Sequence, residues 1–320
     1  MRQTAITKPM PTRDGYGLGL VRAGRANARV VALDADLAES TRSKWFGEEF
    51  PDRFFQMGIS EQDMVGTAAG LAASGFVPFA STFAVFSERA FEFVRNAVAR
   101  PNLPVTIVGS HGGIMTGEDG SSAHAIEDVA IYRALPNMRV VVPCDAIEAA
   151  SAIVSLAEQP GPGYVKLTRA KVPLVLPPDH RFVVGRWDVL RAGSRSPDVA
   201  ILACGALVGE SLAAADLLAE SGVSARVVNA STIKPVDLAT LLDAARDARA
   251  VVTAEDHNVV GGLGGAVSEA LGEHLPTPIE RVGVRDMFAE SGTPTELYAK
   301  YGLTAPHVAE AARRAVARKR

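Results

Sequence analysis

Short apolar runs that alternate with helical segments restrict the possible folds of this 320-residue chain more than any other feature. Residues 29–33 and 199–204 are two such runs, and their length and composition are typical of buried strands. Longer segments between the runs carry apolar residues at helical spacing. Strands that alternate with helices predict an α/β fold, in which a mainly parallel sheet has helices on both faces.

The alternation occurs twice, which predicts two domains. In the first half we expect strands at 29–33, 76–80, 103–108, 139–142 and 164–167, and helices at 13–27, 61–74, 82–99, from 126, and 146–157. In the second half we expect strands at 199–204, 225–229, 250–254 and 279–282. Prolines and glycines interrupt the helical pattern between the two halves. Within this connection we expect an edge strand at 182–190. The predicted domains are 1–175 and 197–320, joined by a linker at 176–196.

Composition excludes several classes of function. The chain is 48% hydrophobic and 22% charged, and its net charge of −3 gives no electrostatic support for binding nucleic acid or an anionic membrane. Cys144 and Cys204 lack a CxxC partner and are expected to be small buried side chains. The sequence shows neither a secretory signal at its start nor an apolar stretch of membrane-spanning length. We therefore expect a soluble, cytoplasmic protein.

One stretch, residues 54–75, organises the first half. Ser60 followed by Asp63 predicts a helix N-cap with an acid in the first turn, and Glu61 lies within that turn among apolar neighbours. Taken alone, Glu61 is best explained as a carboxylate that complements the helix dipole. Other polar residues follow the strands of the same half, at the edge where open α/β sheets place their sites.

Glycines at 261–265 follow a strand and open a helix, which raises the question of a dinucleotide site. The third glycine of the fingerprint is replaced by Val267, so the match is weak. Close packing of helix on sheet explains these glycines better. The second domain shows no convergent polar cluster in the sequence, and we expect it to be structural or to form an interface.

Several motifs, taken together, resemble the C-terminal half of transketolase, which comprises a pyrimidine-binding domain and a C-terminal domain. They occur in family order over nearly the whole chain: Arg13, Asp34-Ala-Asp36-Leu-Ala-Glu-Ser-Thr, Gly58-Ile-Ser-Glu-Gln, Ser81-Thr-Phe-Ala-Val-Phe, Gly117-Glu-Asp-Gly, Pro136-Asn-Met and Glu255-Asp-His-Asn-Val-Val-Gly-Gly-Leu-Gly. In split transketolases this half is a separate subunit.

The resemblance implies a thiamine diphosphate site in which Glu61 is the catalytic carboxylate. A glutamic acid beside N1′ of the aminopyrimidine drives the tautomer change that activates the cofactor, and the group works in a dry site where it can share a proton. The family's positions for the aminopyrimidine pocket correspond to Ile59, Phe83, Phe86 and Arg89. Asp36 corresponds to an acid near the cofactor at the subunit junction.

On the substrate side, the family's phosphate-binding positions correspond to Arg13, Ser40, His111 and Arg169, of which His111 is also a catalytic candidate. Two guanidiniums suit a phosphorylated or otherwise anionic sugar. Asp119 corresponds to an acid that recognises a sugar hydroxyl.

The sequence departs from the family at a catalytic histidine. Ala123 occupies its place and His124 follows one position later, where the family has Gln. Either His124 reaches into the site from the next position, or proton transfer to the sugar is handled differently. We retain His124 as a catalytic candidate.

The diphosphate and Mg²⁺ are held in the family by a Gly-Asp-Gly motif, which this sequence lacks. No other group of residues offers oxygen ligands to Mg²⁺ at suitable spacing, so no metal ligand is expected in this chain. The resemblance therefore implies an N-terminal, diphosphate-binding partner subunit and an α2β2 heterotetramer.

Two alternatives remain: the β subunit of a 2-oxo acid dehydrogenase, and a non-catalytic regulatory subunit with the same fold. A NAD-dependent dehydrogenase is the weakest.

Overall fold

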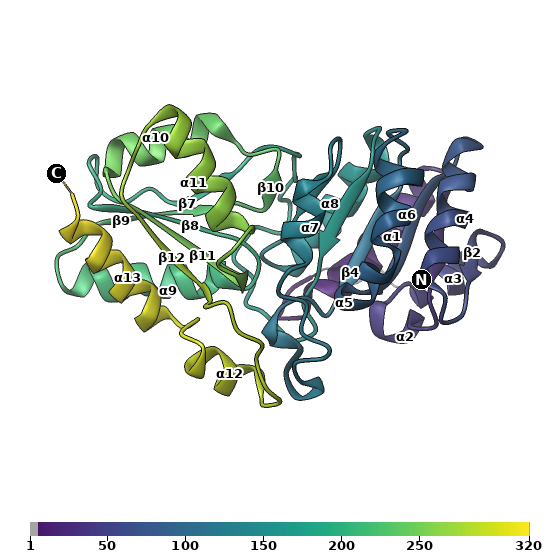
Figure 1. Cartoon of the computed structure of the whole chain (residues 1–320), viewed down its shortest axis with the longest axis horizontal. Coiled ribbons are helices and arrows are strands. Elements are labelled where there is room, and N and C mark those ends of the chain that lie inside the picture. Colours follow the sequence, from purple (N-terminus) through teal and green to yellow (C-terminus); the bar gives the residue numbers. More distant parts are fainter. Residues whose placement is uncertain (1–5, 320) are drawn as a thin grey trace.

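Two sheets, each covered by helices, lie side by side along the longest axis of the chain (Figure 1). The structure is a computed structural model and describes residues 6–319. Residues 1–5, at the start of the chain where no secretory signal was found, lie outside the described residues. Arg320, at the basic C-terminal end, also lies outside them. The α/β fold class and the two mainly parallel sheets predicted from the sequence are confirmed.

The first sheet has the strand order β10-β5-β6-β4-β3-β1-β2. Its strands are parallel except β10, which pairs antiparallel with β5. The strands are β1 (Val30–Asp34), β2 (Phe54–Gln56), β3 (Val77–Phe83), β4 (Thr106–Ser110), β5 (Arg139–Val141), β6 (Gly163–Lys166) and β10 (Thr232–Lys234). β10 comes from the second half of the chain, so the two halves share this sheet.

Helices cover both faces of the first sheet, and β1 shows why. Val30 and Ala32 pack in a cluster with residues of α1 and α8, whereas Val31 and Leu33 pack in a second cluster with α4 and η3. Because successive side chains of a strand point to opposite faces, the continuous apolar run of β1 serves both. The helical elements are α1 (Thr12–Ala26), α2 (Ala38–Thr41), α3 (Lys44–Glu49), η1 (Pro51–Arg53), α4 (Glu61–Ala73), α5 (Ala84–Ser87), η2 (Glu88–Ala90), α6 (Phe91–Phe93), η3 (Val94–Ala99), η4 (Ile114–Asp119), α7 (Asp128–Ala134) and α8 (Ala146–Glu158).

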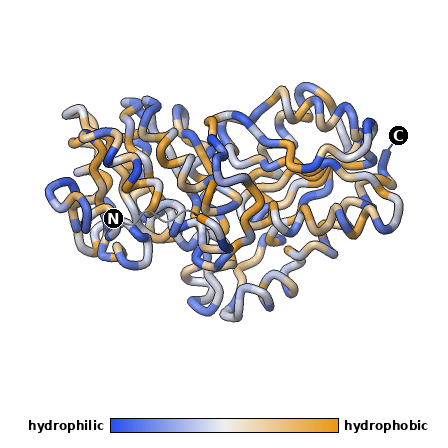
Figure 2. Tube along the Cα trace, turned by 180° about the vertical axis from the view of Figure 1, so that it is seen from behind, coloured by the Kyte–Doolittle hydropathy of each residue, from blue (hydrophilic) through white to orange (hydrophobic). Residues whose placement is uncertain are grey.

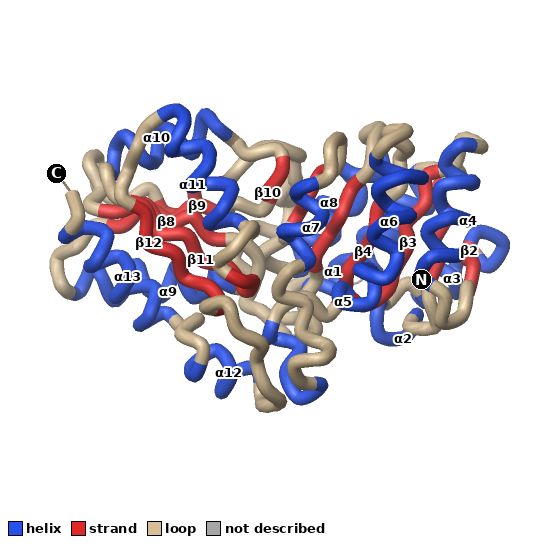
Figure 3. Tube along the Cα trace, in the orientation of Figure 1, coloured by secondary structure: helices blue, strands red, loops and turns tan. Residues whose placement is uncertain are grey.

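The second sheet has the order β12-β11-β8-β9-β7, with only β7 antiparallel to its neighbour. Its strands are β7 (Asp188–Arg191), β8 (Val199–Ala203), β9 (Ala225–Asn229), β11 (Val251–Asn258) and β12 (Ile279–Val284). Its helices are α9 (Leu207–Glu220), α10 (Leu238–Ala248), α11 (Leu263–His274), α12 (Pro294–Lys300) and α13 (Ala305–Ala317). Strands lie between layers of helix in both halves (Figure 3), and hydrophobic residues concentrate along them (Figure 2).

The boundary between the domains stays a prediction, although the expected edge strand has a counterpart. The structure places β7 at Asp188–Arg191, within and just beyond the range 182–190. The hydrophobic clusters continue from one domain into the other: Val140 and Tyr164 of the first sheet belong to the same cluster as Leu202 of the second. The two domains therefore pack on each other through apolar side chains.

The prediction of a single helix at 82–99 is wrong. Residues 77–83 form β3, and the remainder is divided into α5, η2, α6 and the π-helical η3. The hydroxyl of Tyr132 donates a hydrogen bond to the carbonyl oxygen of Ser87, and the N–H of Phe91 bonds to Glu88 instead. A buried side chain from elsewhere in the chain thus bonds to the carbonyl at which the regular helical pattern is interrupted. β2 and β10 were not expected, because three-residue strands carry no measurable periodicity.

Candidate functional site

A pocket of about 250 Å³ lies at the edge of the first sheet where its parallel strands end. Its walls come from the loop after β1, the turn before α4, and the segment from α5 to η2. The lining residues are Ala35, Asp36, Leu37, Ile59, Glu61, Phe86 and Arg89. Five of these seven were predicted for the cofactor site, so the structure brings these five together; Phe83, predicted with them, does not line the pocket.

Glu61 is the first residue of α4 and only 3% exposed, although it faces this pocket. Its Oε2 has no hydrogen-bond partner among the described residues. Ser60 occupies the predicted N-cap position with Asp63 in the first turn, although its hydroxyl donates to the carbonyl of Met57 at 2.8 Å and does not cap α4. A buried carboxylate oxygen at a helix N-terminus, open toward a pocket, can accept a hydrogen bond from a ligand there.

Phe86 lines the pocket with Glu61 and belongs to a stack of three aromatic rings. Phe83 at the end of β3 stacks on Phe86 of α5, with centroids 5.5 Å apart and planes at 11°. The imidazole of His111 also stacks on Phe83, at 3.7 Å. Phe86 lines the pocket, while Phe83 is stacked between Phe86 and His111. Ile59 is 77% exposed at the pocket's rim, and Arg89 is also exposed.

The loop after β1 is held by two acids with different roles. Asp34 is buried and accepts hydrogen bonds from the Leu37 N–H and the hydroxyls of Thr41 and Ser43, and burial raises its pKa to about 6. Asp36 has a positive φ of 64°, and its N–H donates to Oε1 of Gln56 in β2. This bond from β2, a strand that was not expected, fixes Asp36 at the pocket.

Arg13, Ser40 and His111 come together at the start of α1. The Arg13 guanidinium donates to the backbone carbonyl of Ser40 at 3.0 Å and contacts Nε2 of His111 at 3.2 Å. Because a guanidinium only donates, Nε2 accepts, which leaves the proton on Nδ1 to donate to the Ser110 hydroxyl at 2.9 Å. Burial, followed by the charges of the nearby arginines, lowers the pKa of His111 to about 3. His111 is therefore neutral at physiological pH.

Arg169 and Asp119, predicted on the substrate side, lie together with Glu118. The Arg169 guanidinium donates to the carbonyl of Thr116 and to Oε2 of Glu118, each at 2.7 Å, and lies 3.9 Å from Asp119 Oδ1. Glu118 and Asp119 belong to the loop that contains η4. An incoming anion therefore has to compete with Glu118 for this guanidinium.

His124 is buried against the same loop. Its Nε2 lies 3.0 Å from the carbonyl oxygen of Gly117, and its Nδ1 has no partner among the described residues. It does not line the pocket of Glu61. Its catalytic role stays a prediction, whereas the contact seen is one that positions Gly117.

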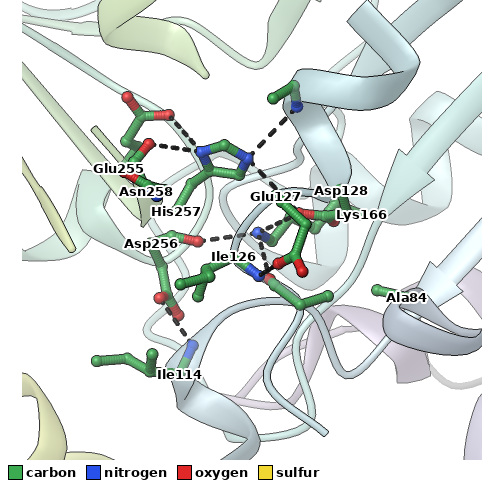
Figure 4. A network of polar contacts seen from close by, with 12 residues as sticks. Ala84, Ile114, Ile126, Glu127, Asp128, Lys166, Glu255, Asp256, His257 and Asn258 are labelled. Atoms are coloured by element: carbon green, nitrogen blue, oxygen red, sulfur yellow. Dashed lines mark hydrogen bonds and ion pairs between the residues drawn. The ribbon is translucent and has the colours of Figure 1, made fainter. Parts of the chain in front are cut away.

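The second domain supplies a network of polar side chains. From the sequence, no convergent polar cluster was expected in this domain, and that expectation is wrong. Figure 4 shows Glu255, Asp256 and His257, at the end of β11, facing Asp128 and Lys166 of the first domain. The Lys166 Nζ lies 2.9 Å from both Asp128 Oδ1 and the carbonyl of Asp256. Burial and the Lys166 charge lower the pKa of His257 to about 4. The motif that begins at Glu255 and the change from apolar to polar residues late in its strand were the available signals for this interface.

Asp256 contacts the loop that contains η4 directly. Its carboxylate accepts hydrogen bonds from the N–H groups of Ile114 (2.9 Å) and Met115 (3.2 Å) and from the Tyr298 hydroxyl (3.0 Å). Ile114 and Met115 open η4, which leads to Glu118 and Asp119. A side chain of the second domain thus fixes a loop of the first, and sequence reasoning missed it.

The glycines at 261–265 serve close packing, as predicted. A Cβ at Gly262 would lie 2.0 Å from Oε2 of Glu255. The Glu255 carboxylate accepts the N–H groups of Leu263 and Gly264 at 2.7 and 2.8 Å, and burial raises its pKa to about 7. Because this acid occupies the helix N-terminus, the donors that a dinucleotide pyrophosphate needs are already used.

Family comparisons cover both domains. Residues 8–175 match the transketolase pyrimidine-binding domain, and residues 185–308 match the transketolase C-terminal domain. The chain belongs to the transketolase family. This family depends on thiamine diphosphate, and members of the family are transferases. The pocket containing Glu61 lies within the first matched region.

Relatives of similar length point to a split form of transketolase. A putative transketolase C-terminal section of Methanocaldococcus jannaschii is 43% identical, over 93% of this chain and 94% of that protein. A 6-deoxy-6-sulfo-D-fructose transketolase subunit of Clostridium sp. (strain MSTE9) is 41% identical, over 96% of this chain and 95% of that protein. A solved structure described as a split gene transketolase, inactive beta4 tetramer, has a TM-score of 0.89 and 46% identity, covering 97% of this chain and 99% of that one. The chain is a split transketolase subunit of the C-terminal type.

No helix among residues 6–319 combines the length and the apolar character that crossing a membrane requires.

Proposed function

We propose that this chain is the pyrimidine-binding subunit of a split transketolase, which transfers a two-carbon ketol unit from a ketose to an aldose. The observation that carries this proposal is the buried, unpartnered Oε2 of Glu61 at the pocket between β1, α4 and α5. Leaving a buried oxygen unpaired costs about 1–3 kcal/mol, so its retention beside a pocket favours a role in ligand binding. The resemblance of the motifs identifies that ligand as the aminopyrimidine of thiamine diphosphate.

The residues present fit this cofactor. Glu61 offers an oxygen to a protonated ring nitrogen, Phe86 offers an aromatic face, and Ile59 and Arg89 close the rim. Thiamine diphosphate, when bound, would supply the carbon nucleophile that ketol transfer needs. The contribution of this chain is to hold the ring, exclude water from Glu61, and keep a proton available at its carboxylate. Asp36 lies at the open side of the same pocket.

Substrate binding is assigned to the neighbouring group of charged residues. Arg13 and Arg169 bind the anionic end of a phosphorylated or otherwise anionic sugar, with Ser40 and neutral His111 beside them. His111 is neutral at pH 7, because its pKa is lowered to about 3, and its Nε2 accepts the hydrogen bond from Arg13. Asp119 is assigned to a sugar hydroxyl, and His124 is kept as a candidate for proton transfer.

The subunit needs a partner to hold the diphosphate. The sequence contains no Gly-Asp-Gly motif, and the pocket of Glu61 has no cluster of oxygen ligands for Mg²⁺ among its lining residues. We infer an N-terminal, diphosphate-binding subunit that binds Mg²⁺, in an α2β2 heterotetramer with sites at subunit junctions. The solved relative described as an inactive tetramer of one subunit supports the need for a second chain.

Reconstitution tests this function. The chain, mixed with a partner subunit that carries Gly-Asp-Gly, thiamine diphosphate and Mg²⁺, should transfer ketol units from a phosphorylated ketose or from 6-deoxy-6-sulfo-D-fructose. The chain alone should be inactive. Turnover of a 2-oxo acid with lipoamide, and none of any ketose, would instead identify a dehydrogenase component. Lack of any cofactor-dependent turnover in the mixture would support the non-catalytic alternative.

A further inference from the structure

Glu148, His180 and Asp188 converge at the junction between the two domains, away from the residues assigned to cofactor and substrate. Each comes from a different segment: Glu148 from α8, His180 from the connection between the domains, and Asp188 from the edge strand β7. One carboxylate oxygen or ring nitrogen from each residue lies within 4.8 Å of the others. Nε2 of His180 and Oδ2 of Asp188 are 3.7 Å apart.

The histidine of this group is buried without a partner. Its side chain is only 9% exposed, and its Nε2 has no hydrogen bond among the described residues. That nitrogen faces the carboxylate of Asp188. Buried polar atoms are almost always bonded, so an orphan in this place calls for a ligand.

A further residue ties these segments together. Asn229 pairs with Asp188 across β7 and β9, and its side-chain nitrogen donates to Oε1 of Glu148 at 2.8 Å. The Oδ1 of Asn229 is buried and has no partner within residues 6–319. Asn229 therefore holds Glu148 of α8 beside Asp188 of β7, and a bound cation would give the unpartnered His180 nitrogen a bond between them.

We propose that Glu148, His180 and Asp188 bind a divalent transition-metal ion of the zinc class, which fastens the interdomain connection to both domains. One imidazole nitrogen with two carboxylate oxygens suits zinc and its neighbours better than Mg²⁺ or Ca²⁺, which prefer oxygen alone. Tetrahedral Zn²⁺ bonds of about 2.0–2.2 Å place ligand atoms about 3.3 Å apart. The distance of 3.7 Å between His180 Nε2 and Asp188 Oδ2 is close to this value. Small side-chain movements would bring all three ligand atoms to the distances that a bound ion requires.

The role of this metal is structural. Its ligands join α8 of the first domain to β7 of the second through the connecting chain, so the ion is bound only when all three segments are in place. A ligand that binds the folded chain alone raises its stability. The site is separate from the partner-bound Mg²⁺ proposed above, and it does not rest on the catalytic function.

Calorimetric titration of the tag-free full chain tests the proposal. After treatment with chelator, wild-type protein should bind about one Zn²⁺ per chain, with much weaker binding of Mg²⁺. Loss of one ligand in His180→Ala or Asp188→Asn should weaken Zn²⁺ binding at least about tenfold. Glu148 is a poor choice for substitution, because its carboxylate also accepts the Cys144 N–H at the start of α8.

His274→Ala is the matched control, since it removes an exposed imidazole in the last turn of α11. It should bind Zn²⁺ as the wild type does. The thermal unfolding midpoint should rise with Zn²⁺ in the wild type and the control but not in His180→Ala. Equal Zn²⁺ binding by the wild type and His180→Ala, or a midpoint that Zn²⁺ leaves unchanged in the wild type, would overturn the proposal.

Discussion

Asp256 accepts a hydrogen bond of 2.9 Å from the backbone N–H of Ile114, 142 positions earlier in the chain. The first residue belongs to the C-terminal domain and the second opens the loop that carries Glu118 and Asp119. Lys166 completes the contact by donating to the Asp256 carbonyl. The C-terminal domain, expected to be structural or to form an interface, is therefore in contact with the loop that carries Asp119, a residue predicted for the substrate side.

Asp256→Asn should weaken substrate binding without removing the cofactor. An amide presents one acceptor and one donor where the carboxylate accepted three hydrogen bonds, so at least one buried N–H loses its partner. We expect the KM of the ketose in the reconstituted enzyme to rise about tenfold or more, with the Kd of thiamine diphosphate unchanged. Steady-state kinetics and cofactor titration measure the two quantities.

Asp243→Asn is the control for Asp256→Asn, because Asp243 is an exposed acid paired only with Arg246 on the surface of α10. It should leave both constants at their wild-type values. A loss of cofactor affinity in Asp256→Asn equal to the loss of ketose affinity would contradict a role confined to the loop.

Glu61→Gln should abolish most turnover while the protein keeps its fold. The amide preserves the size of the side chain but removes the proton-sharing carboxylate at the pocket, and such groups contribute about 10²–10⁴-fold to rate. The turnover number of the reconstituted enzyme tests this. Asp63→Asn, in the same helical turn but exposed, should remain fully active. Full activity in Glu61→Gln would remove the role assigned to Glu61.

The fold could be predicted where the signal was local. β8 and β9 were expected within one residue of their ends, because buried parallel strands are continuous apolar runs. The interrupted helix at 82–99 could not be predicted, since the Tyr132 hydroxyl that takes the Ser87 carbonyl lies 45 positions away. Propensity within the segment contains no information about that hydroxyl.

The same distinction holds for the candidate site. Glu61 has a local signal, a helix start with an acid in its first turn, and a motif that identifies it. Asp256 lies in the motif that begins at Glu255, but nothing in that motif reveals its hydrogen bond to Ile114, because the two residues are far apart in sequence and in different domains. Lys166 has no local signal for its contact with the Asp256 carbonyl for the same reason. The stacking of His111 on Phe83 is likewise visible only when the strand ends are brought together.

Acid should destabilise the wild type more than a variant without the His111 imidazole. The pKa of His111 is about 3 in the folded chain, so between pH 6.5 and 3 the unfolded state binds a proton that the folded state does not. This contribution to stability is present above pH 6.5 and is lost as the pH falls. The free energy of unfolding in urea, measured at pH 7.5 and 5, should fall further for wild type than for His111→Asn.

His274→Asn, which removes an exposed imidazole, should keep the wild-type pH dependence and so serves as the control for His111→Asn. Identical pH dependence in all three proteins would contradict the buried, neutral state of His111.

His124→Ala distinguishes a catalytic imidazole from a positioning one. Its Nε2 lies 3.0 Å from the Gly117 carbonyl, next to Glu118 and Asp119, so removal should loosen the loop that we propose to bind the sugar. We expect the ketose KM to rise several-fold while kcat stays within about threefold of its wild-type value, since neighbouring positions in a loop point in different directions. If kcat instead fell about 100-fold or more at unchanged KM, and adding Ala123→His restored it, the imidazole would belong to proton transfer. Circular dichroism and cofactor titration of each variant establish that the differences arise at the loop and not from unfolding.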